Sequence, residues 1–385
     1  MIPKKVIIAP DSFKGALSAQ EATDVIAGEV KKAFPGCEIV KMPIADGGEG
    51  SVDAALSAIG GKYIYAEVLS PDTRIIRARF GLADNGTVII EMAQSSGITR
   101  QVGLHPMTSN TYGFGQMILR ALDLNSQGHG NGEFTLCIGG SATTDGGCGM
   151  AAALGVSFID KRGISFIPRG ETLCDIEDID MSGIDKRIAG SDFTVMCDVD
   201  NPLHGKNGAA YIYGPQKGAD PEQIAILDNG LRHLSVVLKE YFGRDFSEVP
   251  GAGAAGGLGA GCIAFLGAKL KSGIDTILEL YSFKTHLHGA DLVITGEGKL
   301  DSQSFQGKVL SGILREAGSV PVISICGACD YDPEMLREKG VAVFAASEGI
   351  TIKESMKEPE KYLRIAAKKA LKEFKRGTHA ITCIK

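Results

Sequence analysis

Short apolar runs alternate with segments of helical periodicity at both ends of the chain. Near the N-terminus, the apolar residues 6–9 precede a helix that the capping box at residues 18–21 opens. Near the C-terminus, three apolar runs alternate with helical segments, at residues 291–295, 321–325 and 341–345. Strands that alternate with helices form parallel sheets with right-handed crossovers. The two ends are therefore predicted to build one doubly wound α/β domain.

The middle of the chain has a different pattern. Three strands joined by short turns are predicted at residues 62–69, 74–82 and 87–92, and Asp84-Asn-Gly86 is typical of a hairpin turn. Parallel alternation then resumes around residues 134–138. These patterns, in a chain of 385 residues, predict two α/β domains. We expect a discontinuous doubly wound domain, Rossmann-like or flavodoxin-like, and an inserted mixed-sheet α/β domain. Their expected extents are residues 1–62 plus 284–385 and residues 63–283.

Composition excludes several classes of protein. The net charge is −6, and no basic stripe with aromatic residues is present, which argues against a nucleic-acid partner. The N-terminal apolar run is too short for a signal peptide, and no stretch approaches a membrane span. Nine scattered cysteines suit a reducing cytoplasm better than a disulfide framework. The pair Cys326-Gly-Ala-Cys329 lacks a second cysteine or histidine pair at metal-ligand spacing.

Glycine is about twice as frequent as in an average protein, with 51 residues, and it clusters in loops. Five of these loops follow apolar runs and combine glycine with acidic, hydroxyl or lysine side chains. They are residues 11–15, 46–50, 139–147, 198–205 and 296–301. Such loops collect at the carboxyl ends of strands, where open α/β sheets bind ligands. The combination predicts a site that handles phosphate and Mg²⁺.

The loop at residues 139–147 follows a buried-type strand and precedes a helix. Its glycines allow backbone amides to converge on an anion, and Ser141 and Thr143 add hydroxyl donors. Asp145 could hold a cation that accompanies phosphate. The structural alternative is an N-capped turn between a strand and a helix.

Each acidic loop also has an ordinary structural interpretation. Asp46 and Glu49 have capping-box spacing, which is as consistent with a helix start as with a metal site. Glu297 and Asp301 are metal candidates or simply polar loop residues. Asp198 follows a strand expected to be buried, where an acid is costly unless it is paired or used. Asp200 is its close rival.

The segment at residues 250–261 contains a GxGxxG match, but no convincing strand precedes it and no acid stands at the position that dinucleotide binding needs. A glycine-rich loop that opens a tightly packed helix and a nucleotide cradle remain equal alternatives. Neither a Walker A motif in a strand-helix context nor the protein-kinase motifs are present. A phosphoryl-transfer enzyme would therefore need an unrelated scaffold.

Taken together, these motifs resemble the bacterial glycerate kinase family, in order and over nearly the whole chain. The matching stretches are residues 9–15, 46–50, 139–143 with 145–147, 197–203, 214–218, 251–257, and 295–298 with Asp301. Two positions depart from the family pattern, Thr144 in place of a frequent Asn and Ser304 in place of the usual Thr.

The resemblance implies an ATP-dependent kinase of D-glycerate, acting mostly on the 2-hydroxyl to give 2-phosphoglycerate. It also implies one flavodoxin-like domain, one domain likened to restriction endonucleases, and an active site in the cleft between them. ATP, Mg²⁺ and D-glycerate are then the expected small-molecule ligands of a cytoplasmic monomer or homodimer.

Roles within this site are hypotheses based on chemistry, for direct in-line transfer without a covalent intermediate. Asp198 is the candidate base, and Lys14 is the candidate catalytic cation. The substrate-binding candidates are Asp11, Ser12, Lys14, Asp200 and Asn201. The nucleotide-binding candidates are Gly139, Gly140, Ser141, Thr143, Asp145, Gly146, Gly147, Gly253, Gly256 and Gly257. The metal candidates are Asp46, Glu49, Glu297 and Asp301.

Two other functions use the same loops. A non-catalytic two-domain sensor of a phosphorylated metabolite would need glycine loops, but it gains nothing from several carboxylates near phosphate. A sugar-phosphate dehydrogenase would depend on the GxGxxG match.

Overall fold

The chain divides into two compact units, each described here by itself. The computed structural model describes residues 2–13, 15–44, 50–301, 304, 308–331, 336 and 340–377. Unit 1 comprises Met1–Asp46, Asp53–Ile59 and Gly273–Lys385, and unit 2 comprises Gly47–Val52 and Gly60–Ser272. The two main divisions, at 59/60 and 272/273, fall earlier along the chain than the expected 62/63 and 283/284, and Gly47–Val52 is grouped with unit 2 instead of with the terminal domain.

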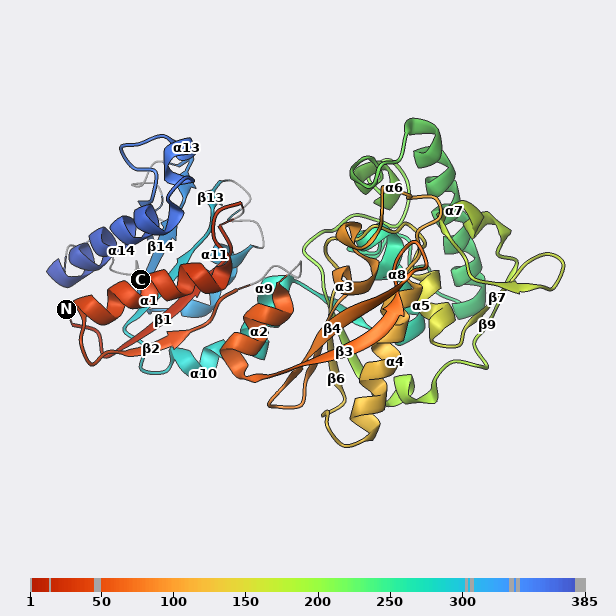
Figure 1. Ribbon diagram of the computed structural model, residues 1–385, viewed down its shortest axis with the longest axis horizontal. Coiled ribbons are helices and arrows are strands. Elements are labelled where there is room, and N and C mark those ends of the chain that lie inside the picture. Colours follow the sequence, from red (N-terminus) through yellow and green to blue (C-terminus); the bar gives the residue numbers. More distant parts are fainter. Residues whose placement is uncertain are drawn as a thin grey trace. The chain divides into compact units, whose positions relative to one another are not determined.

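Unit 1 is built on a parallel sheet of five strands, with the order β16-β14-β12-β1-β2. The strands are β1 (Lys5–Pro10), β2 (Glu38–Lys41), β12 (Leu292–Gly296), β14 (Val322–Cys326) and β16 (Val341–Ala345). β1 pairs in register with β12, Val6 opposite Leu292, although 286 positions separate them in the sequence. The red N-terminal elements therefore lie beside the blue C-terminal ones (Figure 1). This confirms the predicted discontinuous doubly wound fold.

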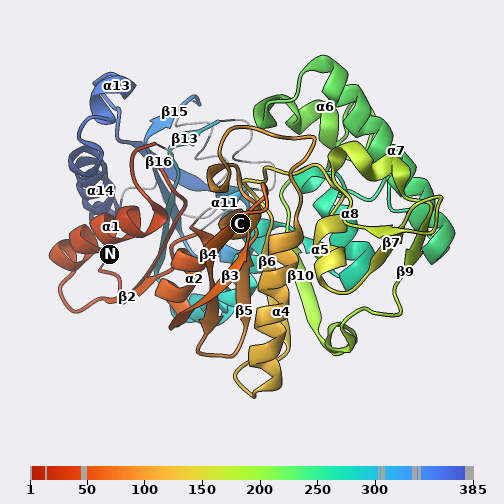
Figure 2. The same cartoon turned by 45° about the vertical axis from the view of Figure 1, so that its right-hand side comes forward.

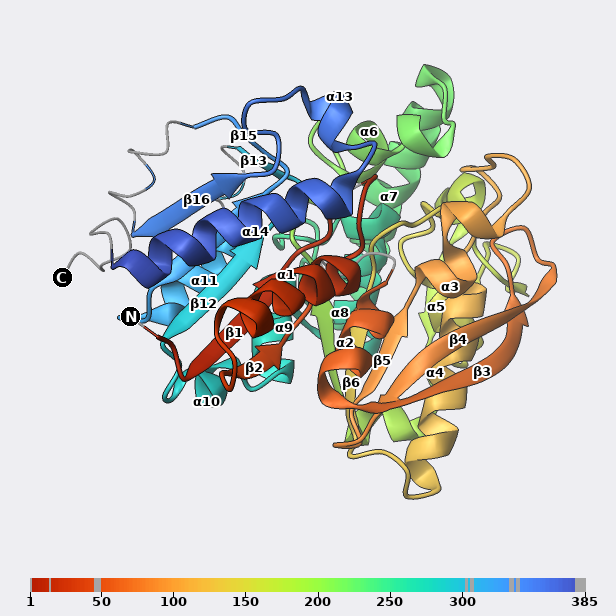
Figure 3. The same ribbon diagram turned by 60° about the vertical axis from the view of Figure 1, so that its left-hand side comes forward.

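Helices enclose this sheet because successive strand residues point to opposite faces. Val6 and Ile8 share a core cluster with Ile26 of α1 (Ala19–Ala33) and Leu363 of α14 (Pro359–Arg376). α1 and α14 run side by side over the strands in Figure 3. The remaining described elements of unit 1 are α9 (Gly273–Leu280), α10 (Phe283–Leu287), β13 (Lys299–Leu300), α11 (Val309–Ala317), β15 (Ala328–Cys329) and α13 (Ile352–Ser355). α2 (Ser51–Ile59) spans the division between the units.

Unit 2 is built on a mixed sheet of six strands, with the order β11-β10-β6-β5-β4-β3. The strands are β3 (Gly61–Leu69), β4 (Ile75–Ala83), β5 (Val88–Glu91), β6 (Glu133–Cys137), β10 (Asp192–Met196) and β11 (Lys269–Lys271). β3, β4 and β5 pair antiparallel, and the strands from β5 to β11 pair parallel. This confirms the predicted mixed sheet, including the hairpin turn at residues 84–86.

Two hydrophobic clusters form the core of unit 2. The first joins the sheet to α4 (Tyr112–Ser126) and α8 (Ala254–Leu266), and α4 runs along the strands in Figure 2. The second gathers around α7 (Pro221–Phe242), which a capping box at Asp220 and Gln223 opens. The other helices are α3 (Ala93–Ser96), η1 (Ile98–Arg100), α5 (Cys148–Ala153), η2 (Gly170–Asp175), η3 (Lys186–Gly190), α6 (Ala209–Tyr213) and η4 (Pro215–Lys217). A small sheet contains β7 (Ser157–Ile159), β8 (Ser165–Phe166) and β9 (Asp178–Asp180).

Within the described ranges, no helix has both the length and the apolar character needed to cross a membrane.

Candidate active site

The glycine loop between β6 and α5 lies against the start of α8. Gly146 N–H donates to the carbonyl of Gly256 at 3.1 Å. A Cβ on Gly256 would lie 2.0 Å from the carbonyl oxygen of Thr143, so only glycine allows this approach. Ala255, Gly256 and Gly257 have left-handed backbone angles, which fold the beginning of α8 around the loop. The structure thus brings together the two glycine segments predicted to bind nucleotide.

Most of this loop is buried inside unit 2. Gly139 is half-buried and Gly140 is exposed, whereas residues 141–147 are buried. The hydroxyl oxygens of Thr143 and Thr144 are buried and have no hydrogen-bond partner within the described part of the chain. Buried hydroxyls without partners are uncommon, so these two oxygens keep hydrogen-bonding capacity that the described part of the chain does not use.

Asp145 organises the loop from within. Its carboxylate accepts hydrogen bonds from Thr111 N–H at 2.7 Å, Thr111 Oγ1 at 2.8 Å, Gly149 N–H at 3.1 Å and Gly147 N–H at 3.4 Å. Burial raises the pKa of Asp145, and these hydrogen bonds oppose that rise. Because its acceptors are engaged inside the unit, the geometry favours a role in fixing the loop over the predicted role in holding a cation.

A buried lysine supports the same loop. Lys217 of η4 is 1% exposed, and its Nζ donates to the carbonyl oxygen of Thr143 at 2.5 Å. Burial lowers the pKa of Lys217 to about 7, against the opposing effect of the nearby Asp145 charge. Sequence reasoning gave this residue no role, although it lies in the stretch 214–218 that matched the family. A lysine that precedes a glycine in a loop is normally solvated, so only the long-range contact reveals the burial of Lys217.

The loop after β10 is hydrogen-bonded to the glycine-rich segment at the start of α8. Gly253 N–H donates to the carbonyl of Asn201 at 2.9 Å. The Asn201 side chain donates to the carbonyl of Asn207 at 2.8 Å and accepts from Tyr213 Oη at 2.6 Å, so it shapes the loop. Asp198 and Asp200 are both exposed. The argument that Asp198 is buried is therefore wrong, because β10 ends at Met196, before this carboxylate.

The end of β5 contributes polar residues that sequence reasoning missed. Glu91 is buried, and its carboxylate accepts from Val52 N–H at 2.7 Å, just after the loop at residues 46–50. Gln94 donates to Glu91 at 3.4 Å and accepts from Arg100 at 2.7 Å. The sequence feature that could have indicated Glu91 is its position as an acid directly after the apolar run at residues 88–90. Backbone hydrogen bonds from Ile98 N–H to Gly140 O at 3.1 Å and from Ala142 N–H to Ser96 O at 3.0 Å tie this segment to the glycine loop.

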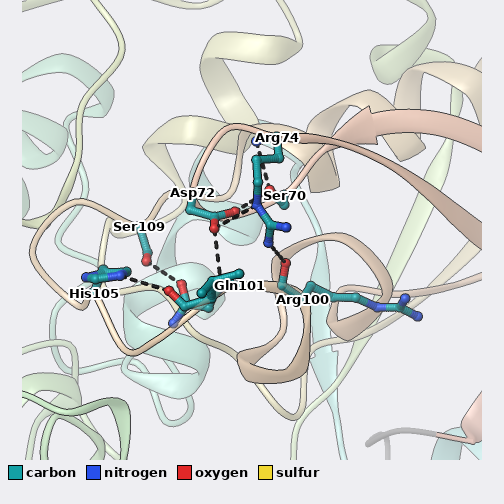
Figure 4. A network of polar contacts seen from close by, with 8 residues as sticks. Ser70, Asp72, Arg74, Arg100, Gln101, His105 and Ser109 are labelled. Carbon is teal, nitrogen blue, oxygen red and sulfur yellow. Dashed lines mark hydrogen bonds and ion pairs between the residues drawn. The ribbon is translucent and has the colours of Figure 1, made fainter.

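A polar network holds the segment between η1 and α4 against the β3–β4 turn (Figure 4). Asp72 accepts from Arg74 Nε at 2.9 Å and from Val102 N–H at 3.3 Å. Arg74 also donates to the carbonyl of Arg100 at 3.1 Å, and Ser109 donates to Gln101 at 2.7 Å. This segment leads to Thr111, whose donors hold Asp145. The network is thus a support for the glycine loop.

In unit 1, two predicted loops meet at the carboxyl ends of β1 and β12. Asp11 N–H donates to the carbonyl of Gly296 at 2.8 Å, and the carboxylate of Asp11 accepts from Ser12 N–H at 2.6 Å. Ile44 N–H donates to the carbonyl of Pro10 at 2.8 Å, which brings the approach to the loop at residues 46–50 to the same edge. Lys14, Asp46 and Glu49 lie outside the described residues.

Glu297 is the most perturbed carboxylate of this group. Burial raises its pKa to about 7; the hydrogen bond from Ser304 and the charge of Lys308 oppose this rise, and the charges of Asp11 and Asp301 add to it. Ser304 Oγ donates to Glu297 at 2.8 Å, and Asp301 N–H donates to Ser304 Oγ at 3.1 Å. The pKa of Glu297 stays raised in spite of Lys308, so a further cation would relieve the repulsion among these carboxylates, and their oxygens fit a hard ion such as Mg²⁺.

The metal assignment nevertheless depends on few ligands. Among the residues that the structure describes, no group of three or more acidic, histidine or cysteine side chains is arranged to hold a metal ion. Mg²⁺ that accompanies a nucleotide needs only one or two carboxylates, because phosphate and water complete its coordination. Glu297 and Asp301 thus remain candidates for that role.

Comparison with known proteins identifies the family of the chain over nearly its whole length. The model of the glycerate kinase family matches residues 6–375. A glycerate 2-kinase from Escherichia coli is 43% identical over 347 residues, which cover 89% of this chain and 90% of the relative. A glycerate kinase from Bacillus cereus is 42% identical over 371 residues, which cover 94% of this chain and 96% of the relative.

A solved structure agrees with these sequence relatives. The crystal structure of a Salmonella typhimurium LT2 protein assigned as glycerate kinase 2 superimposes with a TM-score of 0.84 at 36% identity, covering 97% of this chain and 98% of that one. The match in sequence and in fold thus extends through both units. The chain belongs to the glycerate kinase family.

Proposed function

We propose that this protein transfers the γ-phosphoryl group of Mg²⁺-ATP directly to the 2-hydroxyl of D-glycerate. The observation that carries the proposal is the whole-chain similarity to glycerate kinases, with the relative at 43% identity named a glycerate 2-kinase. Membership of an enzyme family favours this function over the sensor alternative. The two groups of loops supply the chemical groups that such a transfer requires.

The proposal assigns the triphosphate to the glycine segments of unit 2. The exposed backbone of Gly140 and the unpartnered hydroxyls of Thr143 and Thr144 provide donors for phosphate oxygens. Lys217 and Asp145 hold this backbone in shape, which lowers the cost of reorganisation when the anion binds. When bound, Mg²⁺-ATP supplies the phosphoryl group and the charge neutralisation for its transfer.

The proposal assigns the metal and the acceptor to the acidic edge of unit 1. Glu297 and Asp301 would hold Mg²⁺, with Asp46 and Glu49 as further candidates. Asp11, Ser12 and Lys14 would bind glycerate, and the lysine would face its carboxylate. These assignments take the proposed phosphate donors from unit 2 and the proposed metal and acceptor ligands from unit 1, so the proposal needs residues of both units.

Asp198 is the proposed base for the substrate hydroxyl, and Asp200 with Asn201 lies on the same loop. Asp198 is exposed to solvent. Asn201, three residues further along the same loop, is hydrogen-bonded through its carbonyl and its side chain. Phosphoryl transfer depends chiefly on positioning and on charge neutralisation, so this base is expected to accept the proton and to orient the attacking oxygen.

Acceptor-dependent ADP formation tests the proposal. The purified protein is incubated with Mg²⁺-ATP and D-glycerate, and ADP is followed by a coupled spectrophotometric assay. L-Glycerate, glycolate and D-lactate serve as matched acceptors, which respectively invert the configuration at C2, remove the hydroxymethyl group and remove only the 3-hydroxyl oxygen. We expect ADP release that depends on D-glycerate and falls strongly with the other acids. Equal rates with and without D-glycerate would refute the proposal.

A further inference from the structure

Two cysteines frame the turn that follows β14. Cys326 is the last residue of β14, and Cys329 ends the two-residue strand β15. Their side chains are hydrogen-bonded to each other. Cys326 is buried and Cys329 is half-buried, so one thiol of the pair is reachable from solvent. The pair is the motif for which the sequence gave no metal partner, and the family function leaves it without a role.

This turn is bonded to the segment that contains Glu297. Gly327 N–H donates to the carbonyl of Glu297 at 3.0 Å, and Ala328 N–H donates to that of Gly298 at 3.0 Å. Asp330 N–H donates to the carbonyl of Leu300 at 3.0 Å, just before Asp301. A Cβ on Gly327 would lie 2.3 Å from the carbonyl oxygen of Gly298, so the two segments are in close contact. The cysteine turn is therefore held directly against the backbone that carries the proposed metal-binding carboxylates.

The two thiols differ in the way that a reactive pair requires. The hydrogen bond from Cys326 lowers the pKa of Cys329 to about 6, while burial opposes this shift. The same interaction raises the pKa of Cys326. Cys329 is also the more exposed of the two thiols, so a peroxide reaches it first, and the thiolate is the nucleophilic form of cysteine. Cys326 is placed to act as the resolving thiol.

We propose that Cys326 and Cys329 form a redox-active dithiol site that hydrogen peroxide converts into an intramolecular disulfide, and that this disulfide lowers kinase activity. The sulfur of Cys329 attacks one peroxide oxygen, the O–O bond breaks, and Cys329 becomes a sulfenic acid as hydroxide leaves. The sulfur of Cys326 then attacks the sulfenic sulfur, an S–S bond forms, and the sulfenic oxygen leaves as water. In the net reaction, two thiols and one peroxide give one disulfide and two waters.

The effect on activity follows from the hydrogen bonds between the turns. The sulfur atoms must approach from hydrogen-bonding contact to bonding distance, which moves the backbone of residues 327–329. The three bonds to residues 297–300 transmit that movement to Glu297 and Asp301. This part of the inference depends on the proposed function, whereas disulfide formation does not.

Mass spectrometry and activity together test the inference. The full-length protein is treated with hydrogen peroxide, free thiols are alkylated, and the peptide containing residues 326–329 is analysed. We expect this peptide to lose two hydrogen atoms and to escape alkylation. We also expect activity to fall several-fold and to return with dithiothreitol. A fully alkylated peptide after treatment would overturn the dithiol site, and a disulfide without loss of activity would overturn the regulatory effect.

Two variants separate this site from the other thiols. Cys329→Ser changes a half-buried residue outside the proposed machinery, so it should fold, keep basal activity and resist peroxide. Cys174→Ser removes an exposed cysteine of unit 2 and should remain as sensitive as the wild type. Peroxide sensitivity that follows Cys174 would contradict the inference. If the reduced protein forms the disulfide but never phosphorylates glycerate, the proposed function fails while the dithiol site stands.

Discussion

Replacement of Lys217 by methionine tests the interpretation of the buried glycine loop most sharply. The side chain is 1% exposed, and its ammonium group donates to the Thr143 carbonyl at 2.5 Å. Methionine has similar length and no charge. It removes both the cost of burying an ammonium group and the hydrogen bond that holds the loop.

The pH dependence gives this change a definite sign. The pKa of Lys217 is lowered from 10.5 to about 7 in the folded protein. Between these values the unfolded chain binds the proton and the folded protein does not, so the free energy of unfolding rises with pH. The cost of burial is fully present below pH 7 and disappears above pH 10.5. At 1.36 kcal/mol per pH unit, the total is at most about 5 kcal/mol.

The assay is urea unfolding at several pH values between 7 and 10, followed by far-UV circular dichroism because the chain contains no tryptophan. The quantity of interest is the difference in unfolding free energy between wild type and Lys217→Met, which cancels the titration of other groups. We expect this difference to shift in favour of the wild type by about 2–4 kcal/mol from pH 7 to pH 10.

Lys161→Met is the matched control, because Lys161 is an exposed lysine of the same unit. Its difference from the wild type should stay constant over the same pH range. A Lys217→Met difference that is equally constant would refute the claim that a desolvated ammonium group supports the loop.

Three further predictions concern the loops themselves. Gly256→Ala places a Cβ 2.0 Å from the Thr143 carbonyl oxygen at a positive φ, so it should lower the free energy of unfolding in urea by about 3 kcal/mol. Gly243 has a positive φ but open space around it, so Gly243→Ala should lower this free energy by only about 1 kcal/mol. Equal losses in the two variants would contradict the close packing at Gly256. Glu297 has a pKa of about 7 and must be deprotonated to bind a cation, so the Mg²⁺ affinity measured by calorimetry should rise from pH 6 to pH 8. In Glu297→Gln the affinity should no longer depend on pH over this range. If the variant keeps the pH dependence, Glu297 is not the group responsible for it. Asp198→Asn should fold normally and lose about 10²-fold or more in kcat, and near-normal turnover would reject Asp198 as the base.

Much of the fold follows from local sequence patterns. The apolar runs at residues 6–9 and 134–138 became β1 and β6, and the capping box of Ser18 and Glu21 opens α1 as predicted. These signals survive because buried parallel strands require continuous apolar residues and a helix start requires a local hydrogen-bond partner. The hairpin turn at residues 84–86 is equally local.

The glycine-rich start of α8 is a segment whose structure could not be predicted from local sequence patterns. Its glycines have low helix propensity, and Ala255, Gly256 and Gly257 have left-handed backbone angles within α8, which allow the chain to pack closely on the loop after β6. The sequence allowed either a nucleotide cradle or the opening of a packed helix. The structure contains the packed helix, and the nucleotide role stays a prediction.

The candidate site depends even more on long-range contacts. The hydrogen bond from Lys217 to Thr143 joins residues 74 positions apart, and the bond from Thr111 to Asp145 joins residues 34 apart. Neither hydrogen bond can be predicted from the composition or from the spacing of residues in the sequence. For the same reason the burial of Asp145 and the exposure of Asp198 were not foreseen, since each depends on where neighbouring elements end.

Identification of the phosphorylated product tests the central claim most directly. The protein is incubated with Mg²⁺-ATP and D-glycerate, and the mixture is passed to enolase without a phosphoglycerate mutase. Enolase dehydrates only the 2-phosphate ester, so we predict immediate formation of phosphoenolpyruvate in proportion to the ADP released. ADP release with no phosphoenolpyruvate until the mutase is added would show transfer to the 3-hydroxyl and contradict the account.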